Sequence, residues 1–289
     1  MQVRQFHQLA NRPNEFLPML AEGLAAIAEH CRALETAAER SYEAKQYRAA
    51  AILRSVAFEE AGKFLILLDA IRLGRGDKEL LVEQLKRAGD HLSKGLYASA
   101  VDCRAANLKE LRSYLELDRR TMYLDGPNDV DFIFRNSIIA QREEAIYVDL
   151  VADEGSLIWF SPARTDEHNL GFTRACVFLV AALEDLGVCN PDALEVIGQI
   201  WSGFVPVETT SWPENRDMNN ETFRALNSRG LVNPQVNERS LHFFPDWWTF
   251  PLHHEDLGPI KVKESDLIEA RHKHLERMKY DYWGGEPEA

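Results

Sequence analysis

One long apolar stretch, residues 48–73, constrains the fold more than any other part of this 289-residue chain. Its apolar residues fall on one broad side at helical spacing, which is typical of an α-helix in a protein core. Glycines at positions 74 and 76 end the pattern. A helix of this kind buries its apolar side against other helices, so we expect a mainly α fold.

Similar patterns predict further helices on both sides of this stretch, in residues 14–42, 77–101, 104–118, 130–151, 170–187, 191–203 and 265–279. Gly89 and Gly95 weaken the 77–101 helix and would allow a break in it. Residues 152–168 are interpreted as a loop or hairpin. Prolines and aromatic residues gather in residues 204–263, which we interpret as irregular chain with short helices. We therefore expect a helical bundle in residues 1–168 and a C-terminal helical and irregular region in residues 169–289.

Charge and composition narrow the function classes. The formal net charge of −13 excludes a broadly basic surface, so any nucleic-acid site must be a local basic patch. No apolar run approaches the roughly 20 residues that span a bilayer, and the first residues do not resemble a signal peptide. We expect a cytoplasmic protein with no membrane partner. The cysteines are too widely spaced for a CxxC pair: Cys31, Cys103, Cys176 and Cys189.

Three charged residues interrupt the apolar 48–73 helix: Glu59, Glu60 and Lys63. On a wheel of about 100° per residue, Glu59 and Lys63 lie on a polar arc, whereas Glu60 lies among apolar positions. A buried carboxylate needs a donor, and Lys63 is close enough along the helix to supply one. Glu60 is then either a polar contact between helices or part of an active site. Glu59 is interpreted as an ordinary solvent-exposed residue.

Four short motifs, in order along the chain, resemble the AbiV-type abortive infection proteins. Residues 47–63 resemble the helix "A…L…A…EE-x-GK", and residues 90–94 resemble "DH-x-x-K". Residues 142–149 resemble "(K/R)…LYVD", and residues 159–162 resemble the closing "W…P". This family comprises bacterial anti-phage proteins grouped with the HEPN superfamily. The resemblance covers about residues 15–165 and implies a HEPN-like helical bundle and an anti-phage role.

The resemblance also implies a chemistry. Many HEPN proteins are metal-independent ribonucleases in which an Arg, often followed by a polar residue, is separated from a His by about four to six residues. The Arg neutralises the phosphate and the His moves a proton. Arg135 and Asn136 match the start of this motif, but residues 140–142 are Ala, Gln and Arg, so the His is absent. The standard mechanism is therefore not predicted intact.

The two arginines of this segment have two interpretations. In the expected 130–151 helix, Arg142 lies two turns after Arg135, so both would share one apolar face. They either pair with Glu60 and a neighbour inside the bundle, or form an anion site at an interface.

The missing imidazole has one nearby source, His91, which shares a helix face with Lys94. These two residues either reach the Glu60–Lys63 helix and complete a polar cluster, or form an ordinary solvated face. Tyr147 either donates its hydroxyl to such a cluster or simply packs.

No pattern in the chain points to a metal or cofactor. A di-iron bundle needs paired Glu-x-x-His motifs, which are absent, and the spacing of the C-terminal histidines fits no closed zinc site. The resemblance implies a homodimer. Two functions stay open: an effector that acts as a HEPN-like ribonuclease or related toxin, and a non-catalytic module that senses or sequesters a phage or host protein. The effector's polar centre would comprise Arg135, Asn136, Arg142, His91, Glu60 and Lys63, with Lys94 and Tyr147 binding the RNA.

Overall fold

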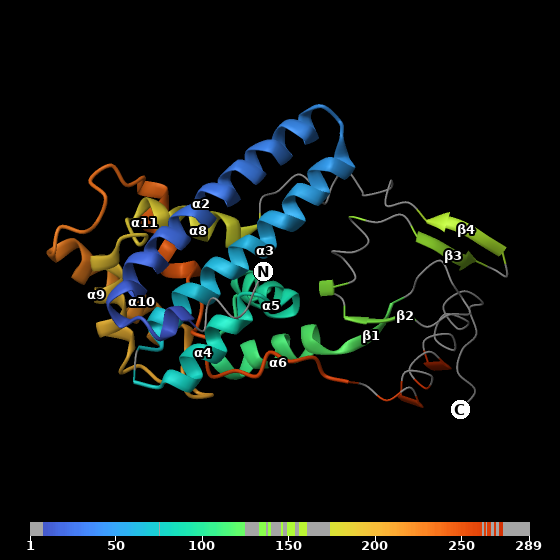
Figure 1. Ribbon diagram of the computed structural model, residues 1–289. Helices are drawn as coiled ribbons and strands as arrows, with labels where there is room; N and C mark the ends of the chain where they lie inside the picture. Colours follow the sequence, from blue (N-terminus) through green and yellow to red (C-terminus); the bar gives the residue numbers. More distant parts are fainter. Residues whose placement is uncertain are drawn as a thin grey trace.

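The computed structural model describes residues 8–74, 76–124, 133–136, 138–139, 146, 149–153, 156–160, 174–261, 263, 265–266, 269 and 272–273. Within these residues the chain is mainly helical, which confirms the predicted fold class (Figure 1). No helix in this part of the chain is both long and apolar enough to cross a membrane.

The two longest helices, α2 (Pro13–Glu43) and α3 (Tyr47–Arg72), form an antiparallel hairpin (Figure 1). Proline at the first position of α2 fits a helix start, where no backbone donor is needed. The turn between them passes through Lys45, whose φ is 59°. The apolar side of α3 is buried along most of its length, and α3 ends before Gly74 at φ 75°, a backbone conformation that glycine adopts without strain.

Three shorter helices follow: α4 (Lys78–Arg87), α5 (His91–Asp102) and α6 (Leu108–Arg119). The break expected in the 77–101 helix is therefore present, and it falls at Gly89. Gly95 lies inside α5. Each of the three helices has an N-cap side chain that accepts a backbone N–H bond: Asp77, Asp90 and Asn107.

Two antiparallel hairpins follow α6. Strands β1 (Thr121–Leu124) and β2 (Ile133–Asn136) pair in the register Thr121↔Asn136, and β3 (Asp149–Asp153) pairs with β4 (Ser156–Phe160). The helix expected over residues 130–151 is therefore wrong at both ends, although residues 138, 139 and 146 are helical. Short apolar runs have the same pattern in strands and in buried helices, so the spacing could not distinguish them. The loop-or-hairpin interpretation of residues 152–168 is confirmed for residues 152–153 and 156–160, which lie in β3 and β4.

The C-terminal region contains α8 (Ala175–Asp185), α9 (Pro191–Trp201), α10 (Trp212–Ser228) and α11 (Glu238–Trp247). The irregular chain expected over residues 204–263 is wrong for α10, which is 17 residues long. A capping box starts this helix, because the Ser211 and Glu214 side chains each bond the other residue's backbone N–H.

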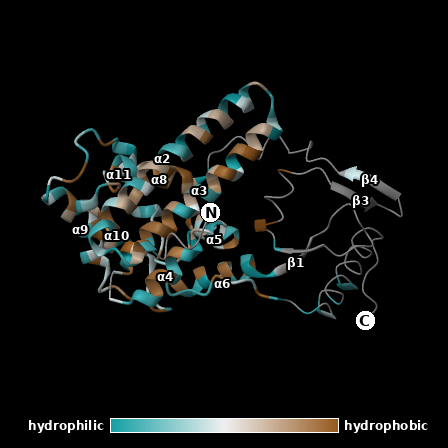
Figure 2. Cartoon of the chain, viewed as in Figure 1, coloured by the Kyte–Doolittle hydropathy of each residue, from teal (hydrophilic) through white to brown (hydrophobic). Residues whose placement is uncertain are grey.

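One apolar core runs through the described helices. In Figure 2 brown, apolar segments alternate with teal, hydrophilic ones along these helices. It extends from Phe16 on α2 to Leu257 in the segment after α11, and α8 and α9 contact both α2 and α3. The described parts of the regions on either side of residue 168 thus share one core. The division of the chain at that residue stays a prediction.

Candidate functional site

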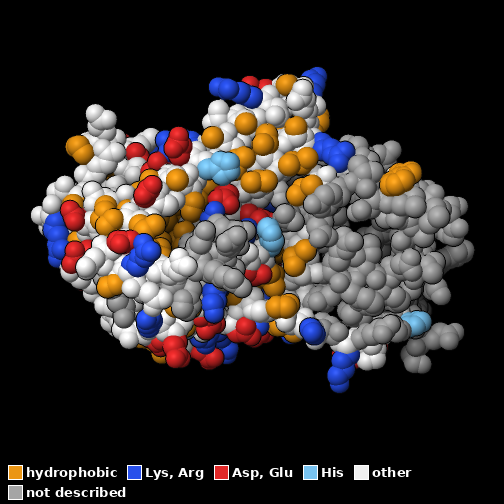
Figure 3. All heavy atoms as spheres, in the orientation of Figure 1, with side chains coloured by type: hydrophobic (Ala, Val, Ile, Leu, Met, Phe, Trp, Pro, Cys, Tyr) orange, Lys and Arg blue, Asp and Glu red, His pale blue; other side chains and the backbone are white. Residues whose placement is uncertain are grey.

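Charged side chains from α3 and α5 meet where these helices cross. Lys94 Nζ donates to Glu59 Oε2 at 2.8 Å, and His91 Nδ1 lies 2.8 Å from the same oxygen. Lys63 Nζ donates to both carboxylate oxygens of Glu60, at 3.0 and 3.4 Å. The bonds to α5 are therefore made by Glu59, whereas the Glu60–Lys63 pair lies within α3. Burial raises the pKa of the Cys31 thiol on α2, and the charges of this pair also influence it. We call Glu59, Glu60, Lys63, His91 and Lys94 the α3–α5 cluster. Figure 3 shows charged and histidine side chains beside the apolar side chains of the α2–α3 hairpin.

Burial separates the members of the α3–α5 cluster. The Lys94 side chain is 9% exposed and that of Glu59 14%, whereas that of His91 is 51% exposed. The Glu59–Lys94 ion pair is therefore shielded from water, while the imidazole lies at the surface. Because Nδ1 of His91 faces the carboxylate, Nε2 on the other side of the ring points away from Glu59.

Two glycines allow this arrangement. A Cβ added at Gly62 of α3 would lie 1.9 Å from the carbonyl oxygen of Lys94, so the two helix backbones touch at this point. A Cβ at Gly95 would lie 2.2 Å from Cγ2 of Ile138. The chain that follows β2 therefore packs on α5 one helical turn from His91.

The pKa of Glu59 reflects both its burial and its partners. Burial by itself would raise this pKa, but the hydrogen bond and charge of Lys94, followed by those of His91, lower it below its ordinary value of 4.5. Glu59 is therefore held as a carboxylate that orients the two basic groups.

This lowered pKa gives a pH-dependent stability. A carboxylate whose pKa is lower in the folded state stabilises the protein above its unfolded pKa, and this stabilisation is lost as the pH falls through the folded value. We expect Glu59→Gln to be less stable than the wild type at pH 7, and the difference to shrink as the pH falls below 4.5. Urea unfolding of both proteins across this pH range measures the difference in their free energies of unfolding. A difference that stays constant with pH would contradict this prediction.

The structure corrects the sequence interpretation of this helix. The bond between Glu60 and Lys63 is confirmed, and Glu60 is largely buried at 20% side-chain exposure. The interpretation of Glu59 as solvent-exposed is wrong, because the polar arc of α3 faces the polar side of α5 and not water. His91 and Lys94 do reach α3, but their acceptor is Glu59, not Glu60.

Asn136 is buried, at 7% exposure, and organises the chain after β2. Its Oδ1 accepts the backbone N–H groups of Ile138 and Ile139 at 3.0 and 3.4 Å, which is the geometry of a helix N-cap. Its Nδ2 donates to the carbonyl of Asp118 at 2.5 Å. Asn136 therefore ties the end of α6 to the segment that packs on Gly95.

The structure describes less of the two arginines in the predicted polar centre. Arg135 lies in β2, where its backbone pairs with Met122 of β1. Its side chain lies outside the part of the chain that the structure describes. Arg142 and Tyr147 lie outside the described residues. Because Arg135 is in a strand, the expectation that it shares a helix face with Arg142 is wrong.

Residues 19–177 match the HEPN_AbiV family model, described as AbiV, which covers more than half of the chain. The chain belongs to the AbiV family. It is thus an abortive-infection protein of HEPN type, as its four motifs predicted. The α3–α5 cluster and Asn136 both lie within the matched residues. No curated protein and no solved structure matches the chain.

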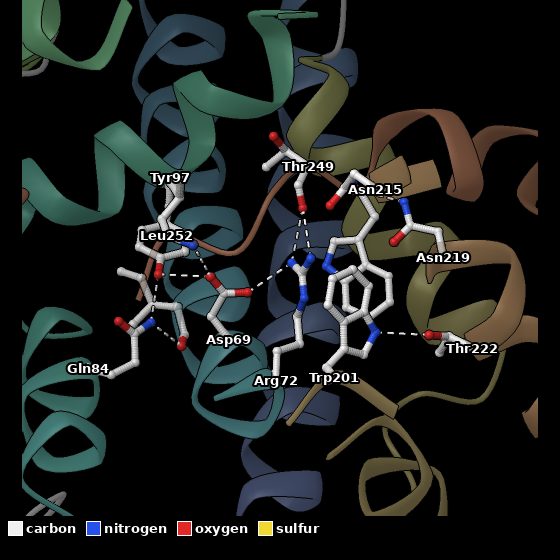
Figure 4. Close-up of polar contacts among 12 residues, drawn as sticks. Asp69, Arg72, Gln84, Tyr97, Trp201, Asn215, Asn219, Thr222, Thr249 and Leu252 are labelled. Carbon is white, nitrogen blue, oxygen red and sulfur yellow. Dashed lines mark hydrogen bonds and ion pairs between the residues drawn. The ribbon is translucent and has the colours of Figure 1, made fainter. Parts of the chain in front are cut away.

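A second polar group, missed in the sequence, joins the AbiV-matched helices to the C-terminal region (Figure 4). Arg72 at the end of α3 bonds Asp69 Oδ1 at 3.0 Å, and both side chains are almost fully buried. Asp69 Oδ2 accepts from Tyr97 Oη at 3.0 Å and from the amide of Leu252 at 2.7 Å. Arg72 also donates twice, at 3.0 Å, to the carbonyl of Thr249.

The Arg72 guanidinium lies between two indole rings. Its central carbon is 3.8 Å from the ring centre of Trp201 and 4.5 Å from that of Trp248. Burial raises the pKa of Asp69 and lowers that of Arg72, while the attraction between the two opposes both shifts. The signal for this pair was its three-residue spacing at the apolar end of α3. Its backbone partners Thr249 and Leu252, however, lie 177 and 183 positions later in the chain.

Proposed function

We propose that this AbiV-family protein is an abortive-infection effector that cleaves RNA at the α3–α5 cluster. The observation that carries the proposal is the half-exposed imidazole of His91, held at Nδ1 by the shielded carboxylate of Glu59. A carboxylate in this position fixes the orientation of the ring, so that Nε2 is the nitrogen left to face a substrate. His91 then replaces the His that the standard motif lacks.

The chemistry requires only the RNA itself. His91 Nε2 takes the proton of a 2′-hydroxyl, whose oxygen attacks the adjacent phosphorus and displaces the 5′-oxygen. The imidazolium returns the proton to this leaving oxygen, which gives a 2′,3′-cyclic phosphate and a 5′-hydroxyl. We assign to Lys63, whose side chain is 17% exposed, the stabilisation of the charge that develops on the phosphate.

The site also needs a positive charge for an anionic substrate. In the α3–α5 cluster the carboxylates of Glu59 and Glu60 are balanced by Lys94 and Lys63, so the cluster is close to neutral. We assign the additional charge to Arg135, since the chain following it packs on α5 one turn from His91. This gives Arg135 the phosphate-binding role that the family motif implies.

The test compares purified wild type with His91→Ala, in EDTA, on a single-stranded RNA. We expect cleavage by the wild type and a rate about 100-fold lower for His91→Ala. The matched control is His30→Ala, because His30 is an exposed histidine on α2 outside the cluster, and it should cleave like the wild type. Circular dichroism checks that all three proteins are folded.

A cellular experiment tests the same proposal. Expression of the wild type should arrest growth and degrade RNA, whereas Arg135→Ala/Arg142→Ala should do neither. Intact RNA in arrested wild-type cells would contradict the ribonuclease function and favour the alternative, a non-catalytic module that binds a phage or host protein. Equal phage protection by both proteins would show that the arginines are structural.

A further inference from the structure

Residues 249–260, which we call the C-terminal strap, contact α3, α4 and α6. In Figure 1 this orange-red segment passes along α6 toward β1. Arginine side chains from all three helices hold it through backbone carbonyls or carboxylates. These arginines are Arg72 on α3, Arg87 on α4, and Arg112 and Arg119 on α6.

The middle of the C-terminal strap is held tightly. Arg87 donates to the carbonyls of Leu252 and Glu255 at 3.0 and 2.8 Å. Arg112 forms a two-point ion pair with the Glu255 carboxylate, with both distances 2.8 Å. The strap lies beyond residue 177 and so outside the AbiV match. Its arginine partners, by contrast, all lie within the matched residues.

The end of the C-terminal strap docks on the last residues of α6. Arg119 Nε donates to the carbonyl of Gly258 at 2.7 Å, and its Nη2 bonds the Asp256 carboxylate. The amide of Ile260 donates to the carbonyl of Arg119 at 3.0 Å, and Ile260 forms a parallel bridge with Arg120.

The opposite side of the same three residues holds Asn136. Its Nδ2 donates to the carbonyl of Asp118 at 2.5 Å and reaches that of Arg120 at 3.5 Å. The carbonyls of residues 118 and 120 thus face Asn136, and the carbonyl between them faces the strap. The Asp118 side chain also accepts from Ser99 of α5 at 2.9 Å. Any shift of the α6 end therefore moves the support of Asn136.

We propose that the C-terminal strap positions the Arg135–Asn136 motif, and that Arg119 is the positioning residue that connects them. Arg119 binds the strap by its side chain and by its carbonyl, and the carbonyls on either side of it bind Asn136. The strap therefore sets where the N-cap at Asn136 stands against α5 and His91. This inference rests on the proposed function for its catalytic consequence, but its structural part does not.

Hydrogen exchange tests the structural part. The amides of Ile138 and Ile139 bond Asn136 Oδ1, so their exchange rates report directly on this cap. We expect Arg119→Met to speed their exchange about tenfold, since it removes a charge-assisted contact. Arg119→Lys keeps the positive charge but loses the planar guanidinium group that bonds two acceptors at once. It should give an intermediate exchange rate. Asn136→Ala, which removes the acceptor, sets the largest expected rate.

The control is Arg112→Met, which removes a contact of the same kind from the same helix to the same strap, but not at the end of α6. It should leave the Ile138 and Ile139 amides unchanged, as should the core amides of α3 in every variant. Unchanged exchange in Arg119→Met, or an equal rise in Arg112→Met, would overturn the assignment to Arg119.

RNA cleavage then tests the catalytic consequence. Arg119→Met should lower kcat about tenfold with KM nearly unchanged, because a mispositioned cap affects the reacting geometry more than RNA binding. A wild type that cleaves no RNA would defeat the proposed function, while the exchange result would stand. Faster exchange together with unchanged kcat would overturn the positioning role.

Discussion

Arg72→Ala should lower the free energy of unfolding by about 3–5 kcal/mol, the usual cost of removing one partner of a buried ion pair. The variant leaves the Asp69 carboxylate 3% exposed without its ion-pair partner, and the carbonyl of Thr249 loses both of its bonds to the guanidinium. It also leaves a cavity between the rings of Trp201 and Trp248. The loss should loosen the C-terminal strap at its first anchor.

Urea unfolding followed by tryptophan fluorescence measures this loss. Arg12→Ala is the matched control, because it removes an arginine from an exposed pair with Glu15, and it should cost less than about 1 kcal/mol. The double variant Asp69→Leu/Arg72→Met removes both charges and should be more stable than Arg72→Ala. If Arg72→Ala costs no more than Arg12→Ala, the buried network does not hold the C-terminal region in place.

The sequence was most informative where structure depends on local spacing. The apolar periodicity of residues 48–73 predicted α3 to within a residue at either end, because a buried helix repeats its apolar side every turn. The Glu60–Lys63 bond was predictable for the same reason, since residues three apart on a helix are neighbours. Residues 133–136 were misassigned because their pairing with β1 depends on a strand nine or more positions earlier.

The rest of the site depends on how distant elements meet. Glu59 lies on a polar arc that a helix wheel places toward water, and only the crossing of α5 shows that it faces Lys94. The C-terminal strap contains no helix or strand pattern of its own, so nothing local predicts its contacts with Arg87 and Arg119. A charged residue on the polar arc of a helix can therefore face the polar side of a second helix, and the arc alone does not assign it to solvent.

Gly62→Ala should destabilise the protein by about 3 kcal/mol, near the upper end for overpacking a core. A methyl group at this position would lie 1.9 Å from the carbonyl oxygen of Lys94, which belongs to the backbone and cannot rotate away. The helices α3 and α5 must therefore separate. This separation lengthens the bonds from Glu59 to Lys94 and His91, so RNA cleavage should fall with stability.

Whether Gly62→Ala raises or lowers the stability distinguishes the effect of packing from that of helix propensity. In a helix with free space, Gly→Ala stabilises by about 0.5–1 kcal/mol because alanine loses less conformational entropy on folding. Gly23→Ala on α2 is the control, since a Cβ at Gly23 meets nothing within 4 Å. Urea unfolding should show Gly23→Ala more stable than the wild type and Gly62→Ala less stable. A Gly62→Ala protein as stable as Gly23→Ala would mean that α3 and α5 do not touch there, and the α3–α5 cluster would lose the close crossing that assembles it.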